Sequence, residues 1–248
     1  MFTGEVIFET GAVKLAGMNQ MSIFNPVSLD ESWQLRHKTA PVEQYESLLH
    51  GTFPVAQEYS SLWRLARLAH FCAMKSEQNG HQDETLRWFE IGKEHAQCAV
   101  EVNHHEVEGH FWLGVNALEW SRRKSWMRAA STFRSAASHI ERAMNQDEEY
   151  HFAGPVRVWA RITHFTPLIL GGSVDRALDI YRRALQIAPH NSTTLIYYAE
   201  ALLADQQKPL ARQILNQIIN APDDKDWMWE QARDRKIAQG HLEKLNVL

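Results

Sequence analysis

The chain has 248 residues, of which 44% are hydrophobic and 23% are charged. These proportions are those of a packed soluble protein and exclude wholesale disorder, and the length suffices for a core without disulfide or metal support. The formal net charge of −4 provides no general basic field, so we predict that nucleic acid is not a partner.

The sequence predicts neither a membrane span nor a secretory leader. No run of about 18 apolar residues is free of charges. Glu5, Glu9 and Lys14 interrupt the first 25 residues where a leader would need a continuous apolar run. On these residues alone we expect the protein in the cytoplasm.

Residues 1–40 differ from the rest of the chain. They contain scattered glycines, an Asn25-Pro26 turn signal and no sustained period, which predicts an irregular N-terminal arm. This arm is either a plain extension or a segment that binds a partner or a neighbouring subunit.

From residue 41 to 248 apolar residues recur every three or four positions, which predicts one helical domain. Glycines and prolines at Gly51 to Pro54, Gly171-Gly172, Pro189 and Pro222 interrupt it. The helices are expected over 41–51, 55–79, 82–102, 105–122, 125–146, 150–166, 173–188, 192–206, 208–220 and 226–244.

An internal repeat is clearest near the C-terminus. Ala177, Tyr181 and Ala184, followed by Pro189, have the spacing of the second helix of a tetratricopeptide repeat. The same pattern returns 34 residues later at Ala211, Leu215 and Ile218.

The first helix of each unit carries a large residue followed by a small one. The small residue lets the paired helix approach, and the large one fills the groove between hairpins. The four pairs are Leu65-Ala66, Leu113-Gly114, Trp159-Ala160 and Tyr198-Ala199. The distance from the small residue of the first helix to that of the second falls from 26 residues in the first unit to 12 in the last. We therefore predict an all-α, TPR-like solenoid or bundle of about four helical hairpins with insertions.

Three segments carry a resemblance to a known family. The stretches 61–67 (SLWRLAR) and 109–114 (GHFWLG), and Gly154-Pro155 ahead of a compact pair, resemble the T-component proteins associated with TRAP transporters. They are also similar to the regulator of microtubule dynamics proteins. The T-component resemblance covers roughly residues 55–222. It implies a helical protein with a ligand-sized pore or concavity, a solute-binding protein as partner, an oligomer, and the periplasm if a leader has been removed.

One side of each first helix should face the hollow of the repeat. The predicted inner residues are Trp63, Arg67 and His70 in the first unit, Phe111, Val115 and Leu118 in the second, Arg157, Arg161 and His164 in the third, and Ile196, Glu200 and Leu203 in the fourth. Arginine binds carboxylates in a two-pronged way and stacks on aromatic rings.

Our hypothesis is that Arg67, Arg157 and Arg161 hold an anionic group of a small amphipathic ligand or a partner protein. Trp63 and Phe111 would then pack its apolar part. The alternative is that these arginines pair with helix carboxylates such as Glu119 and Glu200 and only stabilise the bundle.

The sequence carries no recognisable motif for catalysis or for a cofactor. The histidine-rich stretch 104–110 fails as a zinc motif, because the residue four positions after His105 is Gly109 and His110 lies at five. The sequence also contains no phosphate-binding glycine loop or nucleophile elbow. We predict no catalytic residue, metal or cofactor.

Several of the nine tryptophans fall outside the predicted inner face. We expect Trp33 to pack in the core, and Trp227 and Trp229 either to do the same or to dock the last helix over the end of the stack. Two functions are favoured at this point over a third, an enzyme that would use His70 and His164 of the inner face. One is a binding module that uses its hollow, and the other is a structural scaffold that assembles through its outer helices and N-terminal arm.

Overall fold

The computed structural model describes residues 26–34, 36, 58–123 and 126–247. Within these residues the chain forms ten α-helices and one short 3₁₀ helix, η1. Their bounds are α1 Pro26–Gln34, α3 Tyr59–Gln78, α4 Gln82–Val102, α5 Val107–Ser121, α6 Trp126–Gln146, α7 Tyr150–Phe165, η1 Leu168–Leu170, α8 Val174–Ile187, α9 Ser192–Ala204, α10 Lys208–Asn220 and α11 Met228–Val247. The all-α prediction is confirmed.

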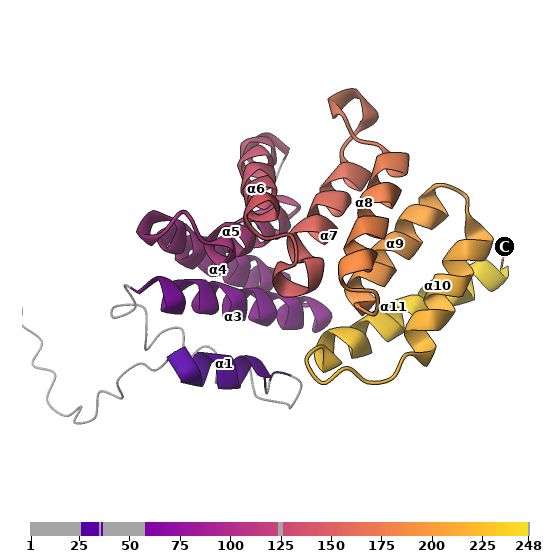
Figure 1. Ribbon diagram of the computed structural model, residues 1–248, viewed down its shortest axis with the longest axis horizontal. Helices are drawn as coiled ribbons and strands as arrows, with labels where there is room; N and C mark the ends of the chain where they lie inside the picture. The colour runs from indigo at the N-terminus through magenta and orange to yellow at the C-terminus, as the bar shows by residue number, and fades with distance from the viewer. Residues whose placement is uncertain (1–25, 35, 37–57, 124–125, 248) are drawn as a thin grey trace, which may run out of the picture.

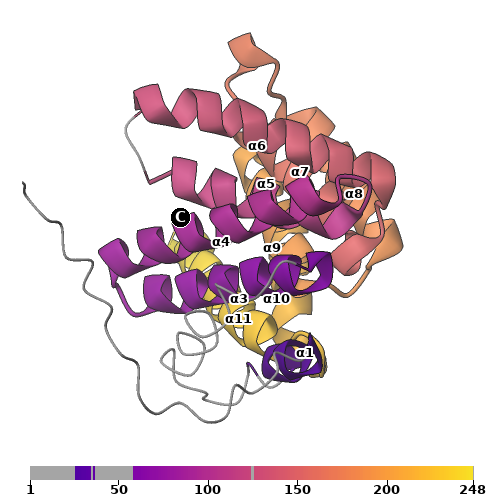
Figure 2. The ribbon, with the colours of Figure 1, turned by 90° about the vertical axis from the view of Figure 1, so that its left-hand side faces the viewer.

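Consecutive helices from α3 to α10 pack as four hairpins, α3 with α4, α5 with α6, α7 with α8, and α9 with α10. Figure 1 shows them side by side, with α11 passing beneath α9 and α10 and with α1 beneath α3. The view from the side places α1 close to α11, so elements from the two ends of the described chain meet (Figure 2).

The small residues of the repeat hold the hairpins together. Ala66, Ala160, Ala177 and Ala199 are all fully buried. At Gly114 a Cβ atom would lie 2.5 Å from Cδ1 of Ile140 and 3.2 Å from the carbonyl oxygen of Ala136, so α5 and α6 approach closely there. The small-next-to-large pattern thus sets the helix spacing, as predicted.

The core has two large parts. One includes Leu29 of α1 and buried residues of α3 to α6, and the other lies among α7 to α11. Tyr181, which the repeat pattern places between helices, is fully buried in the second part.

The N-terminal arm is not irregular throughout. Residues 26–34 form α1, in which Leu29 and Trp33 lie one turn apart on the side that packs against α3. Pro26 begins this helix, where its missing N–H costs nothing. Nine residues are too few for a helical period to be recognised in the sequence, which explains why α1 was not predicted. The remainder of 1–40 except Arg36, and the helix expected over 41–51, lie outside the described residues.

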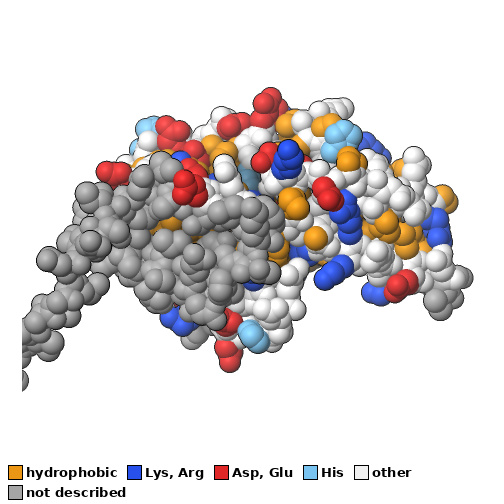
Figure 3. All heavy atoms as spheres, turned by 90° about the horizontal axis from the view of Figure 1, so that it is seen from below, with side chains coloured by type: hydrophobic (Ala, Val, Ile, Leu, Met, Phe, Trp, Pro, Cys, Tyr) orange, Lys and Arg blue, Asp and Glu red, His pale blue; other side chains and the backbone are white. Residues whose placement is uncertain are grey.

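The molecular surface carries both signs of charge. Seen from below, basic and acidic side chains alternate with hydrophobic ones over the part of this face that is not grey (Figure 3). No helix among the described residues is both long enough and apolar enough to cross a membrane.

Candidate functional site

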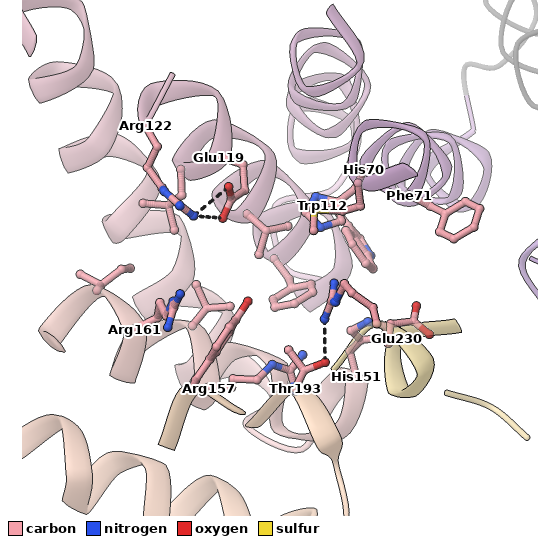
Figure 4. A pocket seen from close by; sticks show the side chains of 18 of the residues that line it. His70, Phe71, Trp112, Glu119, Arg122, His151, Arg157, Arg161, Thr193 and Glu230 are labelled. Atoms are coloured by element: carbon pink, nitrogen blue, oxygen red, sulfur yellow. Dashed lines mark hydrogen bonds and ion pairs between the residues drawn. The ribbon is translucent and has the colours of Figure 1, made fainter. Parts of the chain in front are cut away.

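A cavity of about 370 Å³ lies where the first helices of the four hairpins meet α1 and α11. Its lining is rich in aromatic rings, with a few charged groups among them. The lining residues are Trp33, His70, Phe71, Met74, Phe111, Trp112, Val115, Leu118, Glu119, Arg122, Phe133, His151, Arg157, Val158, Arg161, Ile162, Phe165, Thr193, Tyr197, Trp227, Trp229, Glu230 and Arg233. In Figure 4, Arg157 and Arg161 lie across the cavity from His70, Phe71 and Trp112.

Helix α7 runs along the cavity from its buried end to its mouth. Arg157, Arg161 and Phe165 follow one another at intervals of one turn and all line the hollow. Arg157 is 5% exposed and Phe165 is 62% exposed. Directly after α5 the lining ends at Arg122, whose side chain is 61% exposed. The mouth therefore lies near the C-terminal ends of α5 and α7.

On the side of the cavity away from the mouth, arginine and tryptophan side chains alternate and close it. The Arg67 guanidinium lies 4.9 Å from the ring centre of Trp63 and 4.5 Å from that of Trp33. Arg36 lies 4.0 Å from Trp33 and 6.0 Å from Trp227. Cation–π contacts of this kind are worth about 0.5–2 kcal/mol each. The series joins α3, the α1 segment and the turn before α11, and so fixes the two ends of the repeat around the cavity.

A left-handed turn forms part of the buried end. His151, Phe152 and Ala153 have φ angles of 51°, 58° and 57°, a conformation that costs residues with side chains roughly 1–2 kcal/mol each. The turn places the His151 ring 5.1 Å from the ring centres of both Trp112 and Trp227. Burial, with Arg157, Arg67 and Arg36 nearby, lowers the pKa of His151 well below its ordinary value. His151 is thus a neutral, aromatic part of the wall.

Arg157 is a buried cation whose hydrogen-bond partners are neutral. Its Nη1 donates to the carbonyl oxygen of Phe152 at 2.9 Å, to Oδ1 of Asn191 at 3.3 Å and to Oγ1 of Thr194 at 3.4 Å. Among the described residues, no carboxylate forms an ion pair with it. Asp234 and Glu230 favour its charge electrostatically, but their own ion pairs are with Arg233 and Arg36. Burial lowers the pKa of Arg157 to about 10. The group remains charged at neutral pH and is the excess positive charge of the buried end.

The N-terminus of α9 adds to this positive character. Oδ1 of Asn191 caps the helix by accepting the N–H of Thr194 at 3.0 Å, and Arg157 donates to the same oxygen. Helix N-termini carry a partial positive charge, so an arginine beside one is in a place suited to an anion.

The other charged groups of the lining are paired. Arg161 forms an ion pair with Glu200 and lies 3.9 Å from the ring centre of Tyr197. Burial raises the pKa of Glu200, but hydrogen bonds from His241 and Arg161 outweigh it and lower the pKa to about 2. Glu119 accepts from Arg122 and Arg123 at 2.8 to 3.0 Å. Arg157 is therefore the exception in this lining.

The structure brings some of the predicted inner residues to one cavity and leaves others elsewhere. His70, Phe111, Val115, Leu118, Arg157 and Arg161 line it, whereas Trp63, Arg67, His164, Ile196, Glu200 and Leu203 do not. The predicted phase of α5 holds along the helix. The phase of α9 is off by one residue, because Thr193 and Tyr197 face the hollow in place of Ile196 and Glu200.

Trp63 and Arg67 lie on the expected side of α3, but Arg67 contacts α1 and its guanidinium lies over the Trp63 ring. Arg67 forms an ion pair with Asp30 of α1 at 2.7 Å, so this arginine serves the α1 contact. His164 stacks on Phe165, with ring centres 4.4 Å apart. Glu200 is the partner of Arg161, as in the alternative that the sequence left open.

The sequence reasoning missed the contribution of the chain ends. Trp33, Trp227, Trp229, Glu230 and Arg233 all line the cavity. Their location depends on how α1 and α11 dock, which no local period records. The high number of tryptophans outside the repeat phase was the one available signal.

One family model and one solved structure agree with this architecture. The family model of the TRAP transporter T-component matches residues 61–229. A thermophilic TPR protein of Thermus thermophilus, TTC0263, superposes with a TM-score of 0.55 at 17% identity, covering 83% of this chain and 98% of that one. Yeast Tom70 gives a TM-score of 0.36 at 11% identity, covering 88% of this chain and 54% of that one. A search of curated proteins found no significant match.

Proposed function

Because the chain belongs to the TRAP transporter T-component family, we propose that it is a non-catalytic, TPR-like binding module whose cavity takes a small organic anion with an apolar body. A partner protein, such as a solute-binding protein, would exchange this ligand with it. The family and the fold support a TRAP-associated helical binding module, and the ligand class rests on the cavity.

The observation that carries the proposal is that Arg157 is buried and forms no ion pair among the described residues. A buried ion without an opposite charge costs several kcal/mol. Arg157 is 5% exposed, and its hydrogen bonds go to neutral oxygens. A carboxylate in the adjoining cavity would supply the missing charge and could accept two parallel hydrogen bonds. The buried end of the cavity is thus suited to the anionic group of the ligand.

The remaining lining is suited to an apolar body. The volume of about 370 Å³ lies in the range of small-molecule sites. Phe111, Trp112 and Tyr197 are among the residues whose aromatic rings line the cavity together with Arg157. Burying apolar surface there contributes about 25 cal/mol per Å². The alternative of a scaffold with a filled interior has less support, because the hollow is open and one of its cations has no ion-pair partner among the described residues.

The ligand class can be tested with matched pairs of probes. Tryptophan fluorescence titration or calorimetry would compare aryl and alkyl monocarboxylates with their uncharged amides. We expect the carboxylates to bind at least tenfold more tightly. Arg157→Gln should remove that difference, and Arg182→Gln should not, because the latter arginine pairs with Asp179 on the surface. Equal affinity for acid and amide in the parent protein would contradict the proposal.

The partner requires a separate experiment. Purified solute-binding proteins from TRAP systems would be titrated against the parent protein and against Phe165→Ser, which alters the exposed mouth. We expect weaker binding by the variant. Unchanged binding would place the partner contact elsewhere on the molecule without affecting the ligand assay.

A further inference from the structure

The connection between α7 and α8 displays three consecutive aliphatic side chains to solvent. Leu168, Ile169 and Leu170 of η1 are 84%, 92% and 73% exposed, and Phe165 at the base is 62% exposed. Exposed apolar residues of this size normally occur singly on a soluble protein, and a cluster of them marks an interaction site.

Hydrogen bonds make this tip an ordered structure. The N–H groups of Leu170 and Gly172 both donate to the carbonyl oxygen of Pro167, at 2.8 and 3.1 Å. The N–H of Ser173 donates to the carbonyl oxygen of Thr163 at 3.0 Å and closes the base. A Cβ atom at position 172 would overlap the Thr166 carbonyl oxygen, so glycine is required there. The backbone therefore holds the aliphatic residues outward.

The tip is convex, and Arg176 of α8 donates a hydrogen bond to the carbonyl oxygen of Gly171 at its base. It projects beyond the neighbouring helices in both views of the ribbon (Figures 1 and 2). The segment 165–173 (FTPLILGGS) contains no charged residue. A partner must therefore accept a protruding apolar group without an ion pair from this segment.

Among the possible binding partners of the tip, a lipid bilayer fits these features best. A stable contact between two proteins, including two copies of this chain, takes roughly 800 Å² and about 20–30 residues from each partner. Four side chains on a convex tip fall far short of that. A bilayer interface accepts such a tip without shape complementarity, and the apolar side chains leave water. We propose that the tip at Leu168–Leu170 inserts into the interfacial region of a lipid bilayer.

A contact of this size is weak and reversible by itself, because stable attachment to a membrane takes more than one short apolar element. It would bring the protein to a membrane surface transiently or orient a protein that is held there in another way. The inference is independent of the ligand in the cavity.

Insertion can be measured with a fluorophore whose emission reports the polarity around it. Cys98 is exposed and Cys72 is buried. In a Cys98→Ser background, Ile169→Cys would carry the label, and Val102→Cys, at a residue 54% exposed on α4, would be the control. With neutral phosphatidylcholine vesicles we expect a blue shift and a several-fold increase in emission at position 169 only. No change at 169, or the same change at 102, would overturn the proposal.

A second measurement removes the label. Vesicle flotation would compare the parent with Ile169→Asp and with Val102→Asp. We expect several-fold less Ile169→Asp to float with the vesicles, while Val102→Asp floats like the parent. Light scattering on the same samples tests the alternative that the tip binds a second copy of this chain. If Ile169→Asp abolishes self-association and leaves flotation unchanged, the tip is a contact between copies and the bilayer proposal is wrong.

Discussion

Arg36 and Glu230 lie 194 positions apart in the sequence and form a two-pronged ion pair, with Nε–Oε1 and Nη2–Oε2 distances of 3.0 and 2.9 Å. Their side chains are 3% and 9% exposed. Arg36 also donates to the carbonyl oxygen of Asp226 at 2.5 Å. This contact joins the segment after α1 to α11 and closes the cavity between the two ends of the repeat.

We predict that Arg36→Met lowers the free energy of unfolding by about 3–5 kcal/mol, because it leaves a carboxylate buried without a partner. The double variant Arg36→Met/Glu230→Met should recover most of that loss, because neither charge then remains. Urea unfolding measures both. Arg182→Met is the control, because its pair with Asp179 is exposed and worth less than about 1 kcal/mol. An Arg36→Met effect as small as that of the control would show that the pair does not hold α1.

The close approach of α5 and α6 gives a second prediction. Gly114→Ala should lower the free energy of unfolding by about 1–3 kcal/mol, because the new methyl group would overlap Ile140 and press on the Ala136 carbonyl. Adding Ile140→Val removes the nearest atom and should restore part of the loss. Thermal or urea unfolding of the two single variants and the double variant gives the coupling. Simple additivity of the two single effects would contradict the packing described here.

Most of the fold could be predicted from the sequence, because the repeat shows itself in the spacing of small and large residues within each helix. Ala66 and Ala199 mark the small positions of first helices, and both are fully buried. Pro189 and Pro222 end units, because proline cannot continue a helix. The predicted helix bounds agree with the observed ones to within a few residues over 58–123 and 126–247.

The site was less predictable because part of it is built by long-range docking. Arg157 and Arg161 were assigned to the hollow because their helix has a clear phase. Trp33 and Trp227 reach it only through the placement of α1 and α11, which local periodicity does not encode. The left-handed turn at 151–153 carries no glycine before Gly154, so nothing in the sequence pointed to it.

That turn can be tested at Ala153, whose φ of 57° is unfavourable for alanine and ordinary for glycine. Ala153→Gly loses a buried methyl group but relieves this strain, so the free energy of unfolding should stay within about 0.5 kcal/mol of the parent or rise. Ala160→Gly is the control. Ala160 is equally buried in the regular part of α7, and there glycine should cost more than about 1 kcal/mol. Equal losses in the two variants would argue against the left-handed conformation.

The buried histidines should make the fold sensitive to mild acid. Burial lowers the pKa of His70 to about 4, against an ordinary value of 6.5. Between these two values the unfolded chain binds the proton and the folded chain does not, so stability falls as the pH falls from 6.5 to 4. One such group contributes at most about 1.4 kcal/mol per pH unit. His151 acts in the same direction, because its pKa is also lowered.

Urea unfolding at several pH values between 7.5 and 4.5 measures this dependence. His70→Gln should make it shallower, because glutamine does not titrate. His81→Gln is the matched control, because the His81 side chain is 63% exposed. The carboxylate of Glu200 adds a separate loss only at lower pH, because its pKa is lowered to about 2 and its contribution declines between pH 4.5 and 2. If His70→Gln kept the full slope of the parent between pH 6.5 and 4.5, protonation of His70 would not be opposing the fold, and the neutral wall of the cavity would have to be explained by other groups.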